Sequence, residues 1–161
     1  MRFRHLWVGL IVGSMLLLTS VTYASASRPI RTVSDTISVV NTFSFEPVND
    51  RVTKLSFTSD QQWRGDWNGR NVFVCNAIIN ADKLFSTGGC TGTFEGTVLG
   101  RSGTLTLSAV TIVFQDGTKE IDQGAILSGT GALKGLRGHL ATLVDLGFEP
   151  TLTLVWFVHF E

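Results

Sequence analysis

The chain has 161 residues, which is enough for one ordinary domain and too few for two. Hydrophobic residues make up 43% of the chain and charged residues 16%, so the composition excludes an intrinsically disordered protein. The 13 basic residues balance the 13 acidic ones, and a neutral chain gives no reason to expect a nucleic-acid partner.

The first 26 residues have the three parts of a secretory signal peptide. A basic tip with Arg2 and Arg4 precedes an apolar run over 6–21, and the small residues Ala24, Ser25 and Ala26 follow. The apolar run is shorter than the ~20 residues that a membrane-spanning helix needs. We therefore expect a helical signal peptide over 1–26, cleaved after Ala26, and a secreted or periplasmic protein with no stable membrane span. An uncleaved membrane anchor is the alternative.

The two cysteines, Cys75 and Cys90, lie in the part of the chain that would be exported. Oxidising compartments favour a disulfide between them, and two unpaired buried thiols are the alternative. Together with His139 and His159 they lack the close paired spacing that metal sites use. We therefore expect a disulfide, no metal site and no cofactor.

The rest of the chain is predicted to be all β. Residues 27–35 are expected to form a flexible segment, and short apolar runs between turn residues predict one domain over 36–161. Turns are expected at the glycine-containing positions 68–69, 88–89, 100–103 and 116–117. Leucines at helical spacing over 133–143 are interrupted by glycines, which predicts a single helical turn before a strand. The expected strands cover 36–46, 51–58, 61–66, 71–80, 91–99, 103–115, 121–129, 139–146 and 151–160.

One of these strands is apolar on both faces near its end. Val110, Ile112, Val113 and Phe114 leave no polar face, which predicts a bulge, a covering element or a partner subunit. A homo-oligomer is therefore one of the open expectations.

Three glycine-rich segments, at 92–96, 100–105 and 129–138, carry a resemblance to a known family. In them the chain resembles small bacterial proteins of unknown function that are assigned to the allene oxide cyclase-like barrel, a calycin-like fold related to plant dirigent proteins. The resemblance implies a single antiparallel barrel of eight strands, or nearly eight, closed on itself. It also implies structural roles in turns and corners for Gly100, Arg101, Gly103, Gly129, Gly131, Arg137 and Gly138.

The sequence contains no GxSxG or HExxH motif, so candidate residues are those that a barrel could turn toward its lumen. Glu95 could act there as a desolvated general base, Arg64 could bind an acidic ligand, and His139 is a third weak catalytic candidate. Each has a structural alternative, on the outer surface or in a strand, as does His159. The aromatic candidates for a ligand pocket, or for the core instead, are Trp63, Phe73, Phe94, Trp156 and Phe157.

Three functions remain open from the sequence. The barrel could be a secreted module that binds a small apolar or aromatic molecule. It could be an isomerase or cyclase, or a dirigent-like steering protein, that acts by shape and one carboxylate. It could also be an extracellular scaffold without a ligand, so the sequence leaves open whether the protein is an enzyme.

Overall fold

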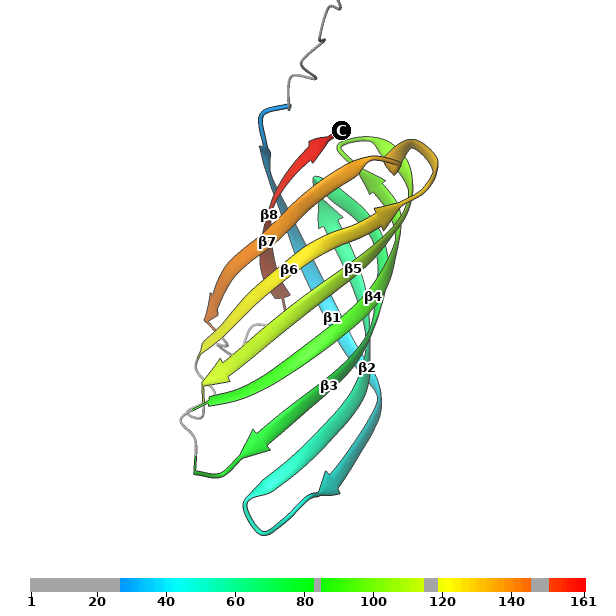
Figure 1. The fold of residues 1–161 in the computed structure, drawn as a ribbon. Helices are drawn as coiled ribbons and strands as arrows, with labels where there is room; N and C mark the ends of the chain where they lie inside the picture. The colour runs from blue at the N-terminus through cyan, green and yellow to red at the C-terminus, as the bar shows by residue number, and fades with distance from the viewer. Residues whose placement is uncertain (1–26, 83–84, 115–118, 146–150) are drawn as a thin grey trace, which may run out of the picture.

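The computed structural model describes residues 27–82, 85–114, 119–145 and 151–161, so the expected signal peptide and the expected turn at 116–117 lie outside the described residues. Eight antiparallel strands form a closed barrel in which consecutive strands pair and β8 pairs with β1 (Figure 1). The predicted fold class is therefore confirmed. The strands are β1 (Ile30–Pro47), β2 (Val52–Gly65), β3 (Trp67–Asn80), β4 (Phe85–Val98), β5 (Arg101–Phe114), β6 (Lys119–Gly129), β7 (Leu136–Asp145) and β8 (Thr151–Phe160).

The predicted single helical turn is a short 3₁₀ helix, η1 (Gly131–Leu133), which leads into β7. It buries Leu133 against the closed end of the barrel core. Within the described ranges, no helix is both long and apolar enough to cross a bilayer.

Two of the predicted turns are wrong, because their glycines lie inside strands. Gly69 belongs to β3, where it faces Gly96 of β4, and 88–89 lies inside β4. A Cβ atom on Gly69 would overlap the carbonyl oxygen of Glu95, so glycine serves here for the close approach of two strands. The expected break between 58 and 61 is also absent, and β2 is one continuous strand.

The first strand begins at Ile30, so the expectation of a flexible segment over 27–35 is wrong from residue 30 onward. Its small polar residues face inward and support a buried tryptophan. The indole Nε1 of Trp67 donates to Thr32 Oγ1 at 2.9 Å, and the backbone N–H of Trp67 donates to Ser34 Oγ at 2.9 Å. These side chains are polar enough to resemble a linker, and only the tertiary structure reveals their role.

Residues 110–113 of β5 pair regularly with both neighbouring strands, and Phe114 pairs with Phe85 of β4, so the bulge predicted for this segment is excluded. The bulges of the barrel lie elsewhere, at Asn41 in β1 and at Leu127 in β6. Val110 is 53% exposed on the outer face, where no described residue covers it. A covering element or a partner subunit remains a prediction for this surface.

One half of the barrel lumen is filled by aromatic rings. Four side chains from β2, β3, β4 and β8 pack with ring centroids between 4.9 and 6.2 Å apart, and each is at most 1% exposed. We call this cluster the aromatic plug. Burying such large rings is a major source of stability for a domain of this size. The plug consists of Trp63, Trp67, Phe94 and Trp156.

Candidate functional site

The other half of the lumen contains a cavity of about 440 Å³. Trp63 and Trp156 of the aromatic plug form part of its lining, whereas Trp67 and Phe94 lie outside it. An eight-stranded barrel is just wide enough to be filled by side chains or to hold one small ligand. This barrel is filled by the aromatic plug in one half and is hollow in the other. The apolar side chains of the cavity wall include Leu55, Phe57, Phe73, Ile79, Val113, Leu140, Leu152 and Leu154.

The disulfide is part of this wall. Cys75 of β3 and Cys90 of β4 lie directly opposite each other, with their Cα atoms 4.1 Å apart, and are joined by the predicted bond. Both residues line the cavity. The bridge therefore ties together two strands at the level where the lumen is not filled by the plug.

A pair of carboxyl groups, Glu120 and Asp122, faces the cavity from β6. The two residues are separated by one position, which places their side chains on the same face of the strand. Asp122 is 7% exposed, and its Oδ1 accepts a hydrogen bond of 2.7 Å from the hydroxyl of Thr111 on β5. Asp122 is also hydrogen-bonded to Glu120, so the two carboxyls form one unit.

The surroundings of Glu120 keep it protonated at neutral pH. Burial in the apolar wall, the charge of Asp122 and the hydrogen bond to Asp122 together raise its pKa from 4.5 to about 8, and burial contributes most. At pH 7 the pair therefore shares one proton and carries one negative charge. Such a pair can accept hydrogen bonds, neutralise a cation, or donate and accept a proton.

The three catalytic candidates from the sequence all lie outside the cavity. Glu95 is exposed on the outer face opposite Arg70, and Arg64 is exposed opposite Asp35. His139 is exposed as well and stacks on a ring of β8 at 5.3 Å. The expectation that they face the lumen is therefore wrong, because the alternation of each strand turns them outward, and the outer-surface alternative is the one observed.

The aromatic candidates divide among three environments. Trp63, Phe73 and Trp156 line the cavity, and Phe94 is buried in the plug. Phe157 lies on the outside, where it stacks with the exposed His139. The cavity walls therefore combine some of the predicted aromatic residues with aliphatic ones.

The expected turn residues lie together at the end of the barrel that carries η1 and the end of β8. Gly100 and Gly131 have φ values of +76° and +60°, which side chains rarely adopt. The Arg101 guanidinium lies 4.1 Å from the centroid of the Phe160 ring, and Arg137 forms a 3.0 Å ion pair with Glu161. Added Cβ atoms would collide with neighbouring backbone at Gly103, Gly129 and Gly138.

Sequence reasoning missed the Glu120–Asp122 pair for two physical reasons. The strand was expected to begin at residue 121, which left Glu120 outside it, whereas β6 begins at Lys119. The alternation of this strand also suggests that Ile121 and Leu127 face the core, but Leu127 sits at a bulge and is 54% exposed. An alternating pattern defines two faces of a strand but does not say which of them lies inside the barrel. The apolar face is usually assigned to the inside, whereas here the face with the two carboxyls lines the partly empty lumen.

No metal site accompanies the pair: among the described residues, no three His, Cys, Asp or Glu side chains are grouped to hold an ion. The site therefore consists of an apolar cavity, a disulfide in its wall and one pair of coupled carboxyls. Ligand binding and proton transfer are the two chemical actions that this set supports.

Comparison with known proteins adds the family. The chain is similar in structure to the crystal structure of a DUF3224-family protein of unknown function from Shewanella oneidensis MR-1, with a TM-score of 0.67 and 17% identity over 83% of this chain and 98% of that chain. This likeness supports the fold alone. No curated protein matches the sequence. A family model described as "Protein of unknown function (DUF3224)" matches residues 36–153, and the chain therefore belongs to the DUF3224 family.

Proposed function

We propose that the exported barrel binds one small, largely apolar molecule in its cavity. The observation that carries this proposal is the half-filled lumen, in which the aromatic plug ends and a cavity of about 440 Å³ with apolar walls begins. That volume falls in the range of about 300–1,000 Å³ that small-molecule sites occupy. A scaffold that only needed stability would gain from filling this space, because unfilled core volume costs free energy.

The proposal is tested by blocking the cavity and following a fluorescent apolar probe. Ala109 lies on β5 two positions before the cavity-lining Thr111, and it lines the cavity itself. Replacing it with tryptophan places a large ring in the lumen. The matched control is Ala141→Trp on β7, which adds the same ring to an exposed position of the outer face.

N-phenyl-1-naphthylamine is the probe, because its emission rises in apolar surroundings and its nitrogen is not protonated at neutral pH. We expect the wild-type protein and Ala141→Trp to bind it with the same affinity and Ala109→Trp to lose the binding. Equal binding by all three proteins would place the probe outside the lumen and contradict the proposal, as would no binding by the wild type.

A second candidate function, isomerisation or cyclisation, is favoured by the carboxyl pair. Glu120 has a raised pKa inside an apolar cavity, which suits a general acid or base at neutral pH. The allene oxide cyclase-like relationship suggested by the sequence belongs to this candidate. A test is the elimination of 5-nitrobenzisoxazole, in which a base takes the carbon-bound proton while the N–O bond breaks to give the nitrile and a phenolate. Turnover that Glu120→Gln abolishes would support the candidate, and no turnover between pH 7 and 9 would count against it.

A further inference from the structure

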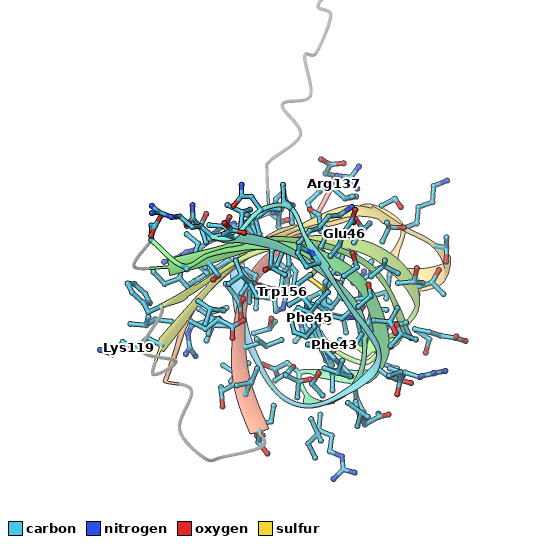
Figure 2. All side chains as sticks on the ribbon, turned by 90° about the horizontal axis from the view of Figure 1, so that it is seen from below. Phe43, Phe45, Glu46, Lys119, Arg137 and Trp156 are labelled. Carbon is cyan, nitrogen blue, oxygen red and sulfur yellow. A yellow bond between two sulfur atoms is a disulfide. The ribbon has the colours of Figure 1, made fainter. Side chains whose placement is uncertain are left out.

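Within the part of the chain that the structure describes, no cation balances the charge of the Glu120–Asp122 pair. Among the described residues that line the cavity there is no lysine, arginine or histidine. Lys119 precedes the pair on β6, but it is exposed and extends outward from the barrel when the molecule is seen from below (Figure 2). A buried charge is costly unless it is paired, so the pair is incomplete in the chain as described.

The groups that face the pair from the neighbouring strands are uncharged. On β5, Val113 lies opposite Glu120 and Thr111 lies opposite Asp122. On β7, Thr142 lies opposite Asp122, and its hydroxyl accepts a 3.0 Å hydrogen bond from the backbone N–H of Val155. A carboxylate pair has room for more donors than the Thr111 hydroxyl provides. Both carboxyls line the cavity, where a bound molecule can donate to them.

Two further polar groups in the same cavity wall lack a partner. Thr36 and Trp156 both line the cavity and are each 1% exposed. Within the described part of the chain, the hydroxyl of Thr36 and the indole N–H of Trp156 make no hydrogen bond. Buried polar groups rarely lack a hydrogen-bond partner. These two groups therefore have room for polar atoms that the described residues do not provide.

An apolar surface leads from the cavity to the outside. The bulge at Asn41 shifts the register of β1, so that Phe43 pairs with Phe57 and Phe45 pairs with Leu55, both of which line the cavity. Phe43 and Phe45 therefore share the inner face with these residues, yet each is 57% exposed. Figure 2 shows both rings directed into the ring of strands. We call Phe43 and Phe45 the aromatic lip.

The aromatic lip is exposed because β1 extends beyond its other neighbour. β8 pairs with β1 only as far as Ile37, and the strand continues to Pro47 with β2 alone (Figure 1). The two rings contact each other edge to face at 4.5 Å. The outer face of the same hairpin is polar, with Thr42 and Thr58 hydrogen-bonded at 2.7 Å. The hairpin is thus apolar only on the side that faces the cavity mouth.

We propose that the ligand of this cavity is an amine: an apolar molecule with one basic nitrogen, whose ammonium group lies at Glu120 and Asp122 and whose hydrocarbon body extends toward the aromatic lip. This inference rests on the proposed function and names its ligand class. The single negative charge of the pair matches one ammonium group, and the remaining ammonium hydrogens meet the unused carboxylate lone pairs. The apolar walls and the lip cover the rest of the molecule.

The test compares compounds of one shape that differ in a single polar group. The probes are 1-adamantylamine, 1-adamantanol, 2-adamantanone and adamantane-1-carboxylate, each measured by displacement of N-phenyl-1-naphthylamine and by calorimetry at pH 7. We expect the amine to bind the wild-type protein about tenfold more tightly than the alcohol, the size of one charge-assisted hydrogen bond. The carboxylate should bind most weakly.

The variants locate the preference. Asp122→Asn removes the negative charge of the pair and should reduce the advantage of the amine over the alcohol to less than about threefold, while the alcohol binds as before. Glu120→Gln replaces the neutral member of the pair and should keep most of that advantage. Glu95→Gln removes an exposed carboxylate from the outer face and should leave every affinity unchanged. The comparison of amine with alcohol in the wild type decides the question even if a variant does not fold.

The outcomes separate this inference from the proposed function. Equal binding of amine and alcohol, tighter binding of the ketone or the carboxylate, or an amine preference that survives in Asp122→Asn would overturn the inference. In each of those cases, binding of the uncharged probes inside the barrel still supports the proposed function. Failure of every probe, including N-phenyl-1-naphthylamine, would refute both.

Discussion

Replacing Glu120 with glutamine should change how the stability of the barrel depends on pH. The carboxyl has a pKa of 4.5 in an ordinary setting and about 8 in the cavity wall. The folded protein therefore holds a proton between these two pH values that the unfolded chain releases. By linkage, the free energy of unfolding is highest near pH 4.5 and falls as the pH rises to about 8.

The size of the effect follows from the same pKa change. Each pKa unit is worth about 1.36 kcal/mol, so the full difference sets an upper limit of about 5 kcal/mol. Because Glu120 is only partly buried, solvent screening reduces this to roughly 2 kcal/mol. Glutamine keeps the shape of the neutral acid and cannot ionise, so Glu120→Gln should be the more stable protein at pH 8 and should lose its advantage near pH 4.5.

The assay is urea denaturation of wild type and variant at several pH values between 4.5 and 9, at constant ionic strength. The difference between the two proteins isolates Glu120, because every other residue is the same in both. Glu95→Gln is the control, because it makes the same substitution at an exposed position of the outer face. A difference between wild type and Glu120→Gln that stays constant over this pH range would refute the reasoning about the buried pair.

Three further changes test the fold that holds the cavity. Replacing Cys75 and Cys90 together by serine should lower the free energy of unfolding by about 3 kcal/mol, as judged by denaturant titration, since the bridge closes a 15-residue separation; unchanged stability would show that the bridge does not constrain the unfolded chain. Gly131→Val should cost well over about 1 kcal/mol because φ is +60° there, whereas Gly89→Ala, whose added Cβ meets nothing within 4 Å, should be tolerated; equal midpoints for the two would contradict the account of the corner. Trp67→Leu should cost about 3 kcal/mol or more by leaving a gap in the aromatic plug, and a thermal midpoint like that of the wild type would show that the plug does not stabilise the barrel.

The sequence predicted the architecture better than the site. The strand class and the helical turn before β7 follow from local composition and turn chemistry, which act over short distances. The disulfide was predicted from the expectation that the chain is exported. The start of β1 did not follow, because Thr32 and Ser34 are polar residues whose burial depends on Trp67 from another strand. Local pattern cannot report a partner that is 33 or 35 residues away.

The site depends on which face of each strand is inside. Glu95 and Glu120 both lie in strands with alternating patterns, yet the first is exposed and the second faces the cavity. Each of the bulges at Asn41 and Leu127 changes which face of its strand the residues beyond it occupy. Neither bulged residue is a glycine or proline that would predict it from the sequence. Only the closure of all eight strands determines that Glu120 and Asp122 face the cavity and that the aromatic lip lies on the same inner face as its wall.

The most direct test of a ligand site in the lumen is a crystal of the protein soaked with 1-bromonaphthalene, in which the anomalous signal of bromine reports where an apolar ring settles. We predict a bromine peak inside the barrel, among Phe57, Phe73 and Leu154. A lumen without bromine, in crystals whose outer surface does carry it, would contradict the claim that this barrel is built around a binding cavity.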